Sequence, residues 1–253
     1  MRLAVLIPAH NEAKTVGEIV REAKRHADLV LVVDDGSTDE TGTIARKAGA
    51  KVVRNERNMG LGVALRKGFR EALKYEWDVI VTLDADGQHD PKEIPKLVKE
   101  IEKGAEVVIG ERDLSSYPFV KRLGNFFLNI LTNFLAGTNI GDTESGFRAL
   151  RRDALELMLP EMRARHYEVA SEMILLIGKH RLKYANVGVS SPIYVKGVTI
   201  VDGVKNFLYI LRRRNLRTRD YVRGLLLLPK LFLRKLMRSS SKTRGHPRTC
   251  RCC

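Results

Sequence analysis

The sequence predicts an α/β fold in which a mostly parallel, Rossmann-like sheet is covered by helices. Short apolar runs alternate with longer segments of helical periodicity over about 200 residues, which is the order in which parallel sheets are built. Several of these runs stop at polar loops, and open α/β sheets bind ligands at such strand ends. Cysteine is absent before Cys250, so we expect a packed core rather than disulfides to hold the fold.

Each predicted element follows from its residues. The apolar runs predict strands, because strands that are buried on both faces of a sheet are nearly continuous in Val, Ile and Leu. These strands are expected at Leu3–Ile7, Leu29–Val33, Lys51–Val53, Val79–Leu83 and Glu106–Ile109. Helices are expected at Thr15–His26, Thr41–Ala48, Asn58–Tyr75, Pro91–Lys103 and Phe119–Ala136. Together they predict one α/β domain over residues 1–204.

Two carboxylates one residue apart follow the fourth predicted strand. Asp84 and Asp86 come directly after Val79–Leu83, so both side chains are expected at the carboxyl edge of the sheet. Mg²⁺ and Mn²⁺ prefer such oxygen ligands, and they often complete their coordination with water and substrate phosphates. A solvated turn is the alternative, because Asp and Gly are ordinary turn residues.

Two further strand ends carry polar loops. The first predicted strand leads into Pro8–Glu12, and the second leads into Asp34–Asp39. Three polar loops at one edge are typical of a nucleotide site at the point where the strand order of an open sheet reverses. Three independent solvated turns would explain the pattern less well.

Five segments, taken in order, resemble the motif series of family 2 glycosyltransferases, and above all the dolichol-phosphate mannosyltransferase group. They are Pro8–Glu12, Val33–Ser37, Asp84–Pro91, Gly110–Arg112 and Asp142–Arg148. Five motifs in the right order are far more specific than any one of them, and the resemblance covers roughly residues 1–200. It implies the A-type glycosyltransferase fold and a hexosyltransferase that uses a GDP- or UDP-hexose, a polyprenyl (dolichyl) phosphate acceptor, and Mg²⁺ or Mn²⁺.

The resemblance also implies roles for single residues. Asp86, helped by Asp84 and Gln88, is expected to hold the metal ion. Contacts with the nucleotide sugar are expected from Pro8, Ala9, Glu12, Val33, Asp35, Asp84, Ala85 and Arg122. Arg112, together with Arg122, is expected to hold the acceptor phosphate, since an arginine offers a fixed fork for phosphate oxygens. Lys121 and Arg122 have the alternative of being the solvated face of a helix.

The expected reaction is a direct displacement at the anomeric carbon, with inversion. We predict Asp86, Arg112 and Asp142 as the residues that carry it. A phosphate acceptor is already an anion and needs no strong base, so Asp142 is expected to orient the loop or the sugar rather than to remove a proton. Three later residues complete the sugar pocket or serve the structure alone: His166, Glu168 and Glu172.

The net charge of +15 lies almost entirely in the last fifth of the chain. From Lys205 onward the sequence holds 15 basic residues and one acidic residue, Asp220, which leaves 30 basic and 29 acidic residues before it. The basic residues alternate with Leu and Phe, a mixture that suits an anionic membrane surface better than a nucleic acid. We expect basic amphipathic helices over residues 205–238, then a disordered basic tail over residues 239–253.

No apolar run reaches the roughly 20 residues of a membrane-spanning helix, and no signal core follows the N-terminus. The expected location is therefore cytoplasmic and peripheral, on the inner face of the membrane. The uncharged stretch from Leu123 to Ala136 fits a core helix, or a helix that enters the lipid interface or guides an isoprenoid chain, and we favour the second. The terminal cluster of Cys250, Cys252 and Cys253 suits a disordered end better than metal binding or lipid attachment.

Two other functions compete with lipid glycosylation. A transferase with a soluble or polysaccharide acceptor would keep the donor site, although the Gln-x-x-Arg-Trp motif usual in processive synthases is absent. A non-catalytic protein that binds a nucleotide or a nucleic acid would explain the basic C-terminal region but not the carboxylate pair, so no nucleic-acid partner is expected. The sequence does not report the sugar, the nucleobase or the oligomeric state.

Overall fold

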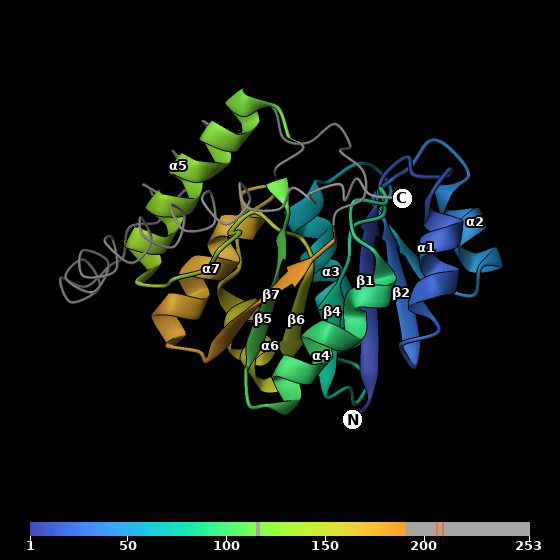
Figure 1. Cartoon of the computed structure of the whole chain (residues 1–253). Coiled ribbons are helices and arrows are strands. Elements are labelled where there is room, and N and C mark those ends of the chain that lie inside the picture. Colours follow the sequence, from blue (N-terminus) through green and yellow to red (C-terminus); the bar gives the residue numbers. More distant parts are fainter. Residues whose placement is uncertain (115–116, 191–205, 207–208, 210–253) are drawn as a thin grey trace, which may run out of the picture.

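The computed structural model describes residues 1–114, 117–190, 206 and 209 (Figure 1). Within them, one seven-stranded sheet has the strand order β3-β2-β1-β4-β6-β5-β7. The strands are β1 (Leu3–Ala9), β2 (Leu29–Asp34), β3 (Lys51–Arg54), β4 (Val79–Thr82), β5 (Val107–Arg112), β6 (Arg148–Arg151) and β7 (Tyr184–Val189). The predicted α/β class and mostly parallel sheet are confirmed, and the five predicted strands correspond to β1–β5.

Helices cover both faces of this sheet. They are α1 (Val16–Ala23), α2 (Thr41–Lys47), α3 (Leu61–Ala72), α4 (Ile94–Glu102), α5 (Phe119–Ala136), α6 (Arg152–Met158) and α7 (Val169–His180), with short 3₁₀ turns η1 (Pro91–Glu93) and η3 (Leu159–Glu161). The helix predicted from Pro91 thus begins as a 3₁₀ turn, and Asp90 caps it by accepting a hydrogen bond from the Lys92 backbone N–H at 3.0 Å. The helix predicted from Asn58 begins only at Leu61, after Gly60.

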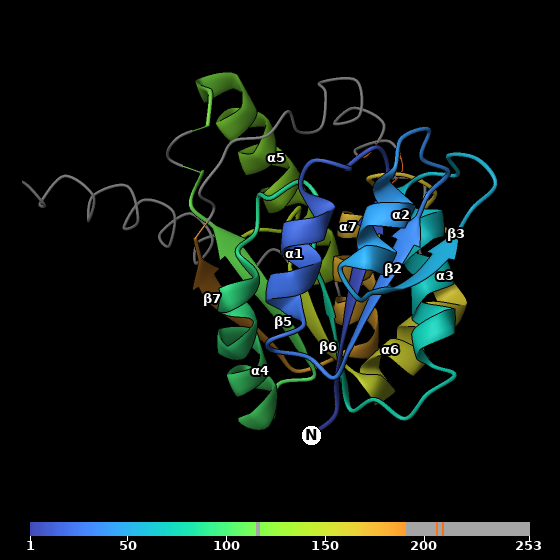
Figure 2. The same cartoon turned by 90° about the vertical axis from the view of Figure 1, so that its right-hand side faces the viewer.

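The core has two layers because neighbouring residues of a strand point to opposite faces of the sheet. Along β1, Leu6 belongs to the layer under α3, α6 and α7, whereas Val5 and Ile7 belong to the layer under α1, α2 and α4. The two helix layers can be followed in Figure 2. All three of these residues are fully buried, which is why the strands are apolar on both faces.

One strand runs against the others. β6 lies between β4 and β5 and is antiparallel to both, with Ala149 opposite Val81 and Val108. The remaining pairs, β1 with β2 and β4, β2 with β3, and β5 with β7, are parallel. Because β6 is reversed, its first residue, Arg148, lies opposite Thr82 at the end of β4 and opposite Ile109 in β5. The turn that precedes β6 is thereby brought to the polar edge of the sheet.

Helix α5 projects from the carboxyl edge of the sheet and packs on α7 (Figure 1). Its C-terminal half is buried and contains polar side chains, among them Asn129 and Asn133. Its N-terminal half exposes Leu123 and Phe127, at 44% and 61% of their surface. The uncharged segment is therefore a core helix at one end and an apolar surface at the other.

No helix within the described part of the chain has the length and hydrophobicity needed to cross a membrane. Of the predicted appendage at residues 205–238, the structure describes Asn206 and Tyr209, both helical. The predicted tail at residues 239–253, with Cys250, Cys252 and Cys253, lies outside the described residues, as does the predicted domain end at residues 191–204.

Candidate active site

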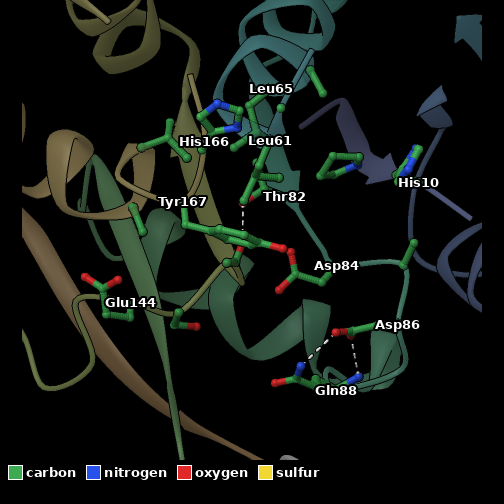
Figure 3. Close-up of a pocket in the computed structure, with 18 of the residues that line it drawn as sticks. His10, Leu61, Leu65, Thr82, Asp84, Asp86, Gln88, Glu144, His166 and Tyr167 are labelled. Atoms are coloured by element: carbon green, nitrogen blue, oxygen red, sulfur yellow. Dashed lines mark hydrogen bonds between the residues drawn. The ribbon is translucent and has the colours of Figure 1, made fainter. Parts of the chain in front are cut away.

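A cavity of about 400 Å³ opens at the carboxyl edge of the sheet (Figure 3). The ends of β1 and β4, the start of α3, the turn before β6 and the start of α7 surround it. Nine of the predicted site residues line it: Pro8, Ala9, Glu12, Asp35, Asp84, Ala85, Asp86, Gln88 and Arg112. The convergence of three polar strand ends, expected from the sequence, is present in the structure.

Three predicted site residues do not line the cavity. Val33 is fully buried in the core beneath it. Arg122 is exposed on the first turns of α5, the position that its alternative interpretation describes. Asp142 is only 5% exposed and acts on the cavity through Arg112.

One end of the cavity is organised by Asp35. Its carboxylate accepts hydrogen bonds from the Asn55 side chain at 2.6 Å and from the backbone N–H groups of Met59 and Gly60 at 3.0 and 2.8 Å. Gly60 has φ 96°, and a Cβ there would lie 2.4 Å from the carbonyl oxygen of Arg165. A glycine is therefore required where α3 begins, and Asp35 fixes the loop that leads into it.

Three carboxylates gather at the centre of the cavity: Glu12, Asp84 and Asp86. Burial raises the pKa of Asp84, and the charges of Arg112 and Arg148 only partly offset this. Burial also raises the pKa of Asp86, with the charge of Asp84 adding to it, and burial followed by the charge of Asp86 raises the pKa of Glu12. The cluster is therefore short of positive charge.

This shortage of positive charge suits a divalent cation whose coordination would be completed by the oxygens of a bound diphosphate. Within the described ranges, no group of three or more His, Cys, Asp or Glu side chains could hold a metal ion alone. Mg²⁺ typically takes one or two protein carboxylates and fills its other positions with water and phosphate oxygens, so Asp84 and Asp86 suffice. Gln88 donates to Asp86 at 2.7 Å and accepts from the Tyr117 hydroxyl at 3.1 Å, so its amide orients Asp86 within the protein.

The His89 side chain lies next to Asp84, on the protein side of the carboxylate cluster. Its ring is fully buried beside Phe147, and its Nδ1 lies 3.3 Å from an Asp84 carboxylate oxygen. Burial, together with the charge of Arg112, lowers the pKa of His89 to about 3, so the imidazole is neutral at ordinary pH. A neutral ring adds no positive charge beside Asp84, so only the charges of Arg112 and Arg148 partly offset the burial of that carboxylate.

Arg112 is, with Arg148, one of two arginines of the cavity whose charges act on Asp84. Its guanidinium forms a two-pronged pair with Asp142, from Nε at 2.7 Å and from Nη2 at 3.1 Å. Burial alone would raise the pKa of Asp142, but the charge and hydrogen bonds of Arg112 outweigh burial and lower it. Asp142 is consequently a poor proton acceptor, and its clear contact is with Arg112.

The sequence interpretation missed several residues that line the cavity. Thr82, Tyr117, Asn125, Leu128, Glu144, Arg148 and Tyr167 are among them. Glu144 and Arg148 belong to a motif that was singled out, but nothing in the motif showed which of its side chains face the cavity. Tyr117 and Tyr167 lie in loops that have no periodic pattern, and only the tertiary fold brings them to the site.

The structure separates the three residues that were proposed for a sugar pocket. His166 lines the cavity. Glu172 is buried and accepts hydrogen bonds from the backbone N–H groups of Arg163 and Ala164, and Glu168 accepts one from Arg165. Both carboxylates therefore hold the loop before α7 and do not line the cavity.

The fold is the A-type fold of glycosyltransferases. The glucosyl-3-phosphoglycerate synthase of Mycobacterium tuberculosis, solved in complex with Mn²⁺, UDP and glucosyl-3-phosphoglycerate, is 24% identical and superposes with a TM-score of 0.67. The match covers 85% of this chain and 81% of that one. At this identity the likeness shows the fold alone.

Sequence comparison then fixes the family. The model of glycosyl transferase family 2 matches residues 4–159, and the chain belongs to this family, as predicted. The UDP-N-acetylglucosamine–dolichyl-phosphate N-acetylglucosaminyltransferase of Methanococcus voltae is 31% identical over 236 residues, 82% of this chain and 94% of the relative. The dolichol-phosphate mannosyltransferase of Pyrococcus furiosus is 31% identical over 226 residues, 83% of this chain and 62% of the relative.

Proposed function

We propose that this enzyme transfers a hexose from a GDP- or UDP-sugar to a polyprenyl phosphate, with inversion and with Mg²⁺ or Mn²⁺ as cofactor. One observation carries the proposal: Asp84, Asp86 and Arg112 line the same cavity. A cation-binding pair of carboxylates suits the donor diphosphate, and the positive charge of Arg112 suits a second phosphate, although Asp142 takes the Nε–Nη2 edge of its guanidinium. The relatives named for dolichyl phosphate transfer support this acceptor.

The donor half of the site is assigned to the ends of β1, β2 and β4. Asp35 and the loop before α3 receive the nucleoside, and Glu12, Asp84 and Asp86 lie beside its diphosphate. A metal ion bound to Asp84 and Asp86 would offset the charge that builds up as the nucleoside diphosphate leaves. Gln88 keeps the Asp86 carboxylate in place by donating to it.

The acceptor half is assigned to Arg112. An oxygen of the acceptor phosphate attacks the anomeric carbon, the bond from that carbon to the donor diphosphate breaks, and the nucleoside diphosphate departs with the electron pair. Attack from the face opposite the leaving group inverts the anomeric centre. The proposal assigns no proton transfer to Asp142, which agrees with its lowered pKa.

The decisive experiment offers the full chain a panel of radiolabelled UDP- and GDP-sugars together with polyprenyl phosphate and Mg²⁺. We expect label from one donor to enter the organic phase, and excess chelator to abolish the transfer. Label that enters only water-soluble products would contradict the lipid acceptor, and full activity in chelator would contradict the metal requirement.

A hydroxyl acceptor is the second candidate, and Glu144 favours it. Burial raises the pKa of this cavity-lining carboxylate, and the hydrogen bond from Ser171 and the charge of Arg148 oppose the rise. A base for a hydroxyl needs a raised pKa. The two candidates are separated by a second arm of this experiment, in which a soluble hydroxyl acceptor such as a free hexose replaces polyprenyl phosphate. Labelled water-soluble product in that arm would support the hydroxyl acceptor.

We place the enzyme on the cytoplasmic face of the membrane. The 15 basic residues from Lys205 onward, interleaved with Leu and Phe, support attraction to anionic lipid. The apolar residues exposed at the start of α5, Leu123 and Phe127, supply a second contact of the same kind.

A further inference from the structure

Glu144 lines the part of the cavity formed by the turn before β6. It lies in the turn before β6, on the other side of Asp84 from Asp86 (Figure 3). Gly146, in the same turn, packs against Asp84, since a Cβ added there would lie 2.5 Å from an Asp84 carboxylate oxygen. A donor whose diphosphate lies at Asp84 and Asp86 therefore has the Glu144 side of the cavity left for its sugar.

The Glu144 carboxylate is held in place but not saturated. The hydroxyl of Ser171 on α7 donates to one of its oxygens at 2.6 Å, and the amide of Asn206 donates to the other at 3.3 Å. Ser171 and Asn206 are both buried, so these donors have little freedom to move. An ionised carboxylate has about four acceptor sites, and two remain for a ligand.

The charge of Glu144 selects the kind of group that it accepts. A carboxylate repels the phosphates of the donor and the acceptor, and it accepts hydrogen bonds from hydroxyl groups. The neighbouring cavity wall at Tyr167 also suits a sugar, and Figure 3 shows the Tyr167 side chain extending into this part of the cavity with its hydroxyl toward Asp84. An aromatic ring beside a carboxylate offers an apolar face and a hydrogen-bond acceptor to a hexose.

We propose that Glu144 binds hydroxyl groups of the donor hexose and helps to determine which sugar is accepted. Ser171 and Asn206 are positioning residues, which hold the carboxylate without touching the sugar. The inference rests on the proposed donor site, and it adds to that site a residue that binds the hydroxyl groups of the sugar.

Binding measurements with nucleotides test this inference without relying on turnover. UDP-glucose, UDP-N-acetylglucosamine and GDP-mannose are first titrated against the wild type, and the one that binds most tightly is taken as the donor. The affinity for the corresponding nucleoside diphosphate is then measured in parallel. Hydrogen bonds to charged groups are worth enough that Glu144→Gln should weaken binding of the nucleotide sugar about tenfold or more. The affinity for the nucleoside diphosphate should stay within about twofold.

Deoxy analogues of the donor sugar separate contact from structure. Removing the hydroxyl that Glu144 binds should weaken wild-type binding, and the same removal should cost little in Glu144→Gln, because the two changes remove one interaction. Glu156→Gln is the matched control: it makes the same change on α6, where Glu156 pairs with Arg152, and it should leave both affinities unchanged. Ser171→Ala should act in the same direction as Glu144→Gln, but less strongly.

Three results would overturn the inference while leaving the donor site intact. Equal loss of affinity for the nucleotide sugar and for the nucleoside diphosphate in Glu144→Gln would indicate a structural role for Glu144. Unchanged affinity for both ligands with slower transfer would make Glu144 a base, as the second candidate function requires. If the losses of binding free energy caused by Glu144→Gln and by removal of each sugar hydroxyl were fully additive, a contact between Glu144 and a hydroxyl would be excluded. Absence of any nucleotide binding to the wild type would instead overturn the proposed function itself.

Discussion

At the scale of single residues, the site is a set of charges that compensate one another incompletely. Arg112 and Asp142 satisfy each other, whereas Glu12, Asp84 and Asp86 do not. The sequence predicted most residues of this set because they follow strands directly. It did not predict that Asp142 would occupy the fork of Arg112, since that pair joins positions 30 residues apart in the chain.

The first prediction concerns Asp86. Asp86→Asn should remove most transfer activity, about a hundredfold or more, because the diphosphate loses a ligand to its cation. The fold should persist, since Asp86 lies in a loop. Circular dichroism with a radiolabel transfer assay would measure both, and retained activity would exclude Asp86 as a main ligand.

The same variant makes a prediction for pH. The folded-state pKa of Asp86 is raised, so its ionisation destabilises the folded, metal-free protein, and that destabilisation disappears as pH falls through the folded pKa. Asp86→Asn should therefore be more stable than the wild type at a pH above the folded-state pKa of Asp86, and the difference should shrink as the pH falls through that pKa. Thermal unfolding in chelator at several pH values measures it, and a difference that grows as pH falls would show the opposite shift.

The next prediction concerns Arg112. Arg112→Ala leaves Asp142 buried without its partner, so it should destabilise the fold by about 3–5 kcal/mol. Arg112→Lys keeps the charge but not the fork, and it should restore stability and use of polyprenyl phosphate only in part. The double variant Arg112→Ala with Asp142→Asn removes the unpaired charge and should recover stability without recovering acceptor use. Urea unfolding and the KM for polyprenyl phosphate separate the two effects, and equal loss of donor and acceptor binding would place Arg112 on the donor diphosphate.

At the scale of elements, β6 and its preceding turn decide the geometry of the site. β1, β2, β4 and β5 were predictable because each is an apolar run, and the β-branched pair Val52 and Val53 marks the short β3. In β6 the two residues between Arg148 and Arg151 are Ala149 and Leu150, which do not favour a strand; the burial of β6 comes from the strands on either side. β7 alternates too weakly to be recognised, and it is largely half-buried along the edge of the sheet. Reversal of a strand is a property of the assembled sheet, which a local pattern does not report.

Gly146 tests the role of this turn. Gly146→Ala should displace Asp84 and reduce activity at least tenfold, because the new methyl group would lie 2.5 Å from the carboxylate. Gly124→Ala on α5 is the matched control: nothing lies within 4 Å of its Cβ, and alanine should stabilise that helix by up to about 1 kcal/mol. Transfer assays and thermal unfolding of both variants make the comparison, and normal activity in Gly146→Ala would show that Asp84 tolerates movement.

At the scale of the whole molecule, charge is divided between a nearly neutral enzyme and a basic C-terminal region. Each Lys or Arg near an anionic bilayer contributes about 1 kcal/mol before screening. Truncation before Asp220 should therefore release the protein from anionic vesicles and leave nucleotide-sugar binding intact. Co-sedimentation with vesicles at low and high salt is the measurement. Binding that resists both truncation and salt would move the contact to the exposed residues of α5.

The reversed strand β6 also orders the events of folding. β5 pairs only with β6 and β7 in the sheet, so residues 107–112 have no strand partner while the chain emerges from the ribosome up to that point. The unit β1–β4 can assemble first from short-range parallel pairings, and we expect β5 to wait for residues 148–151. Because Glu144, Gly146 and Arg148 arrive with the same strand, the part of the cavity that they line forms only when the sheet closes. We therefore expect that a nascent chain with the loops after β1, β2 and β4 in place does not yet hold the sugar of the proposed donor.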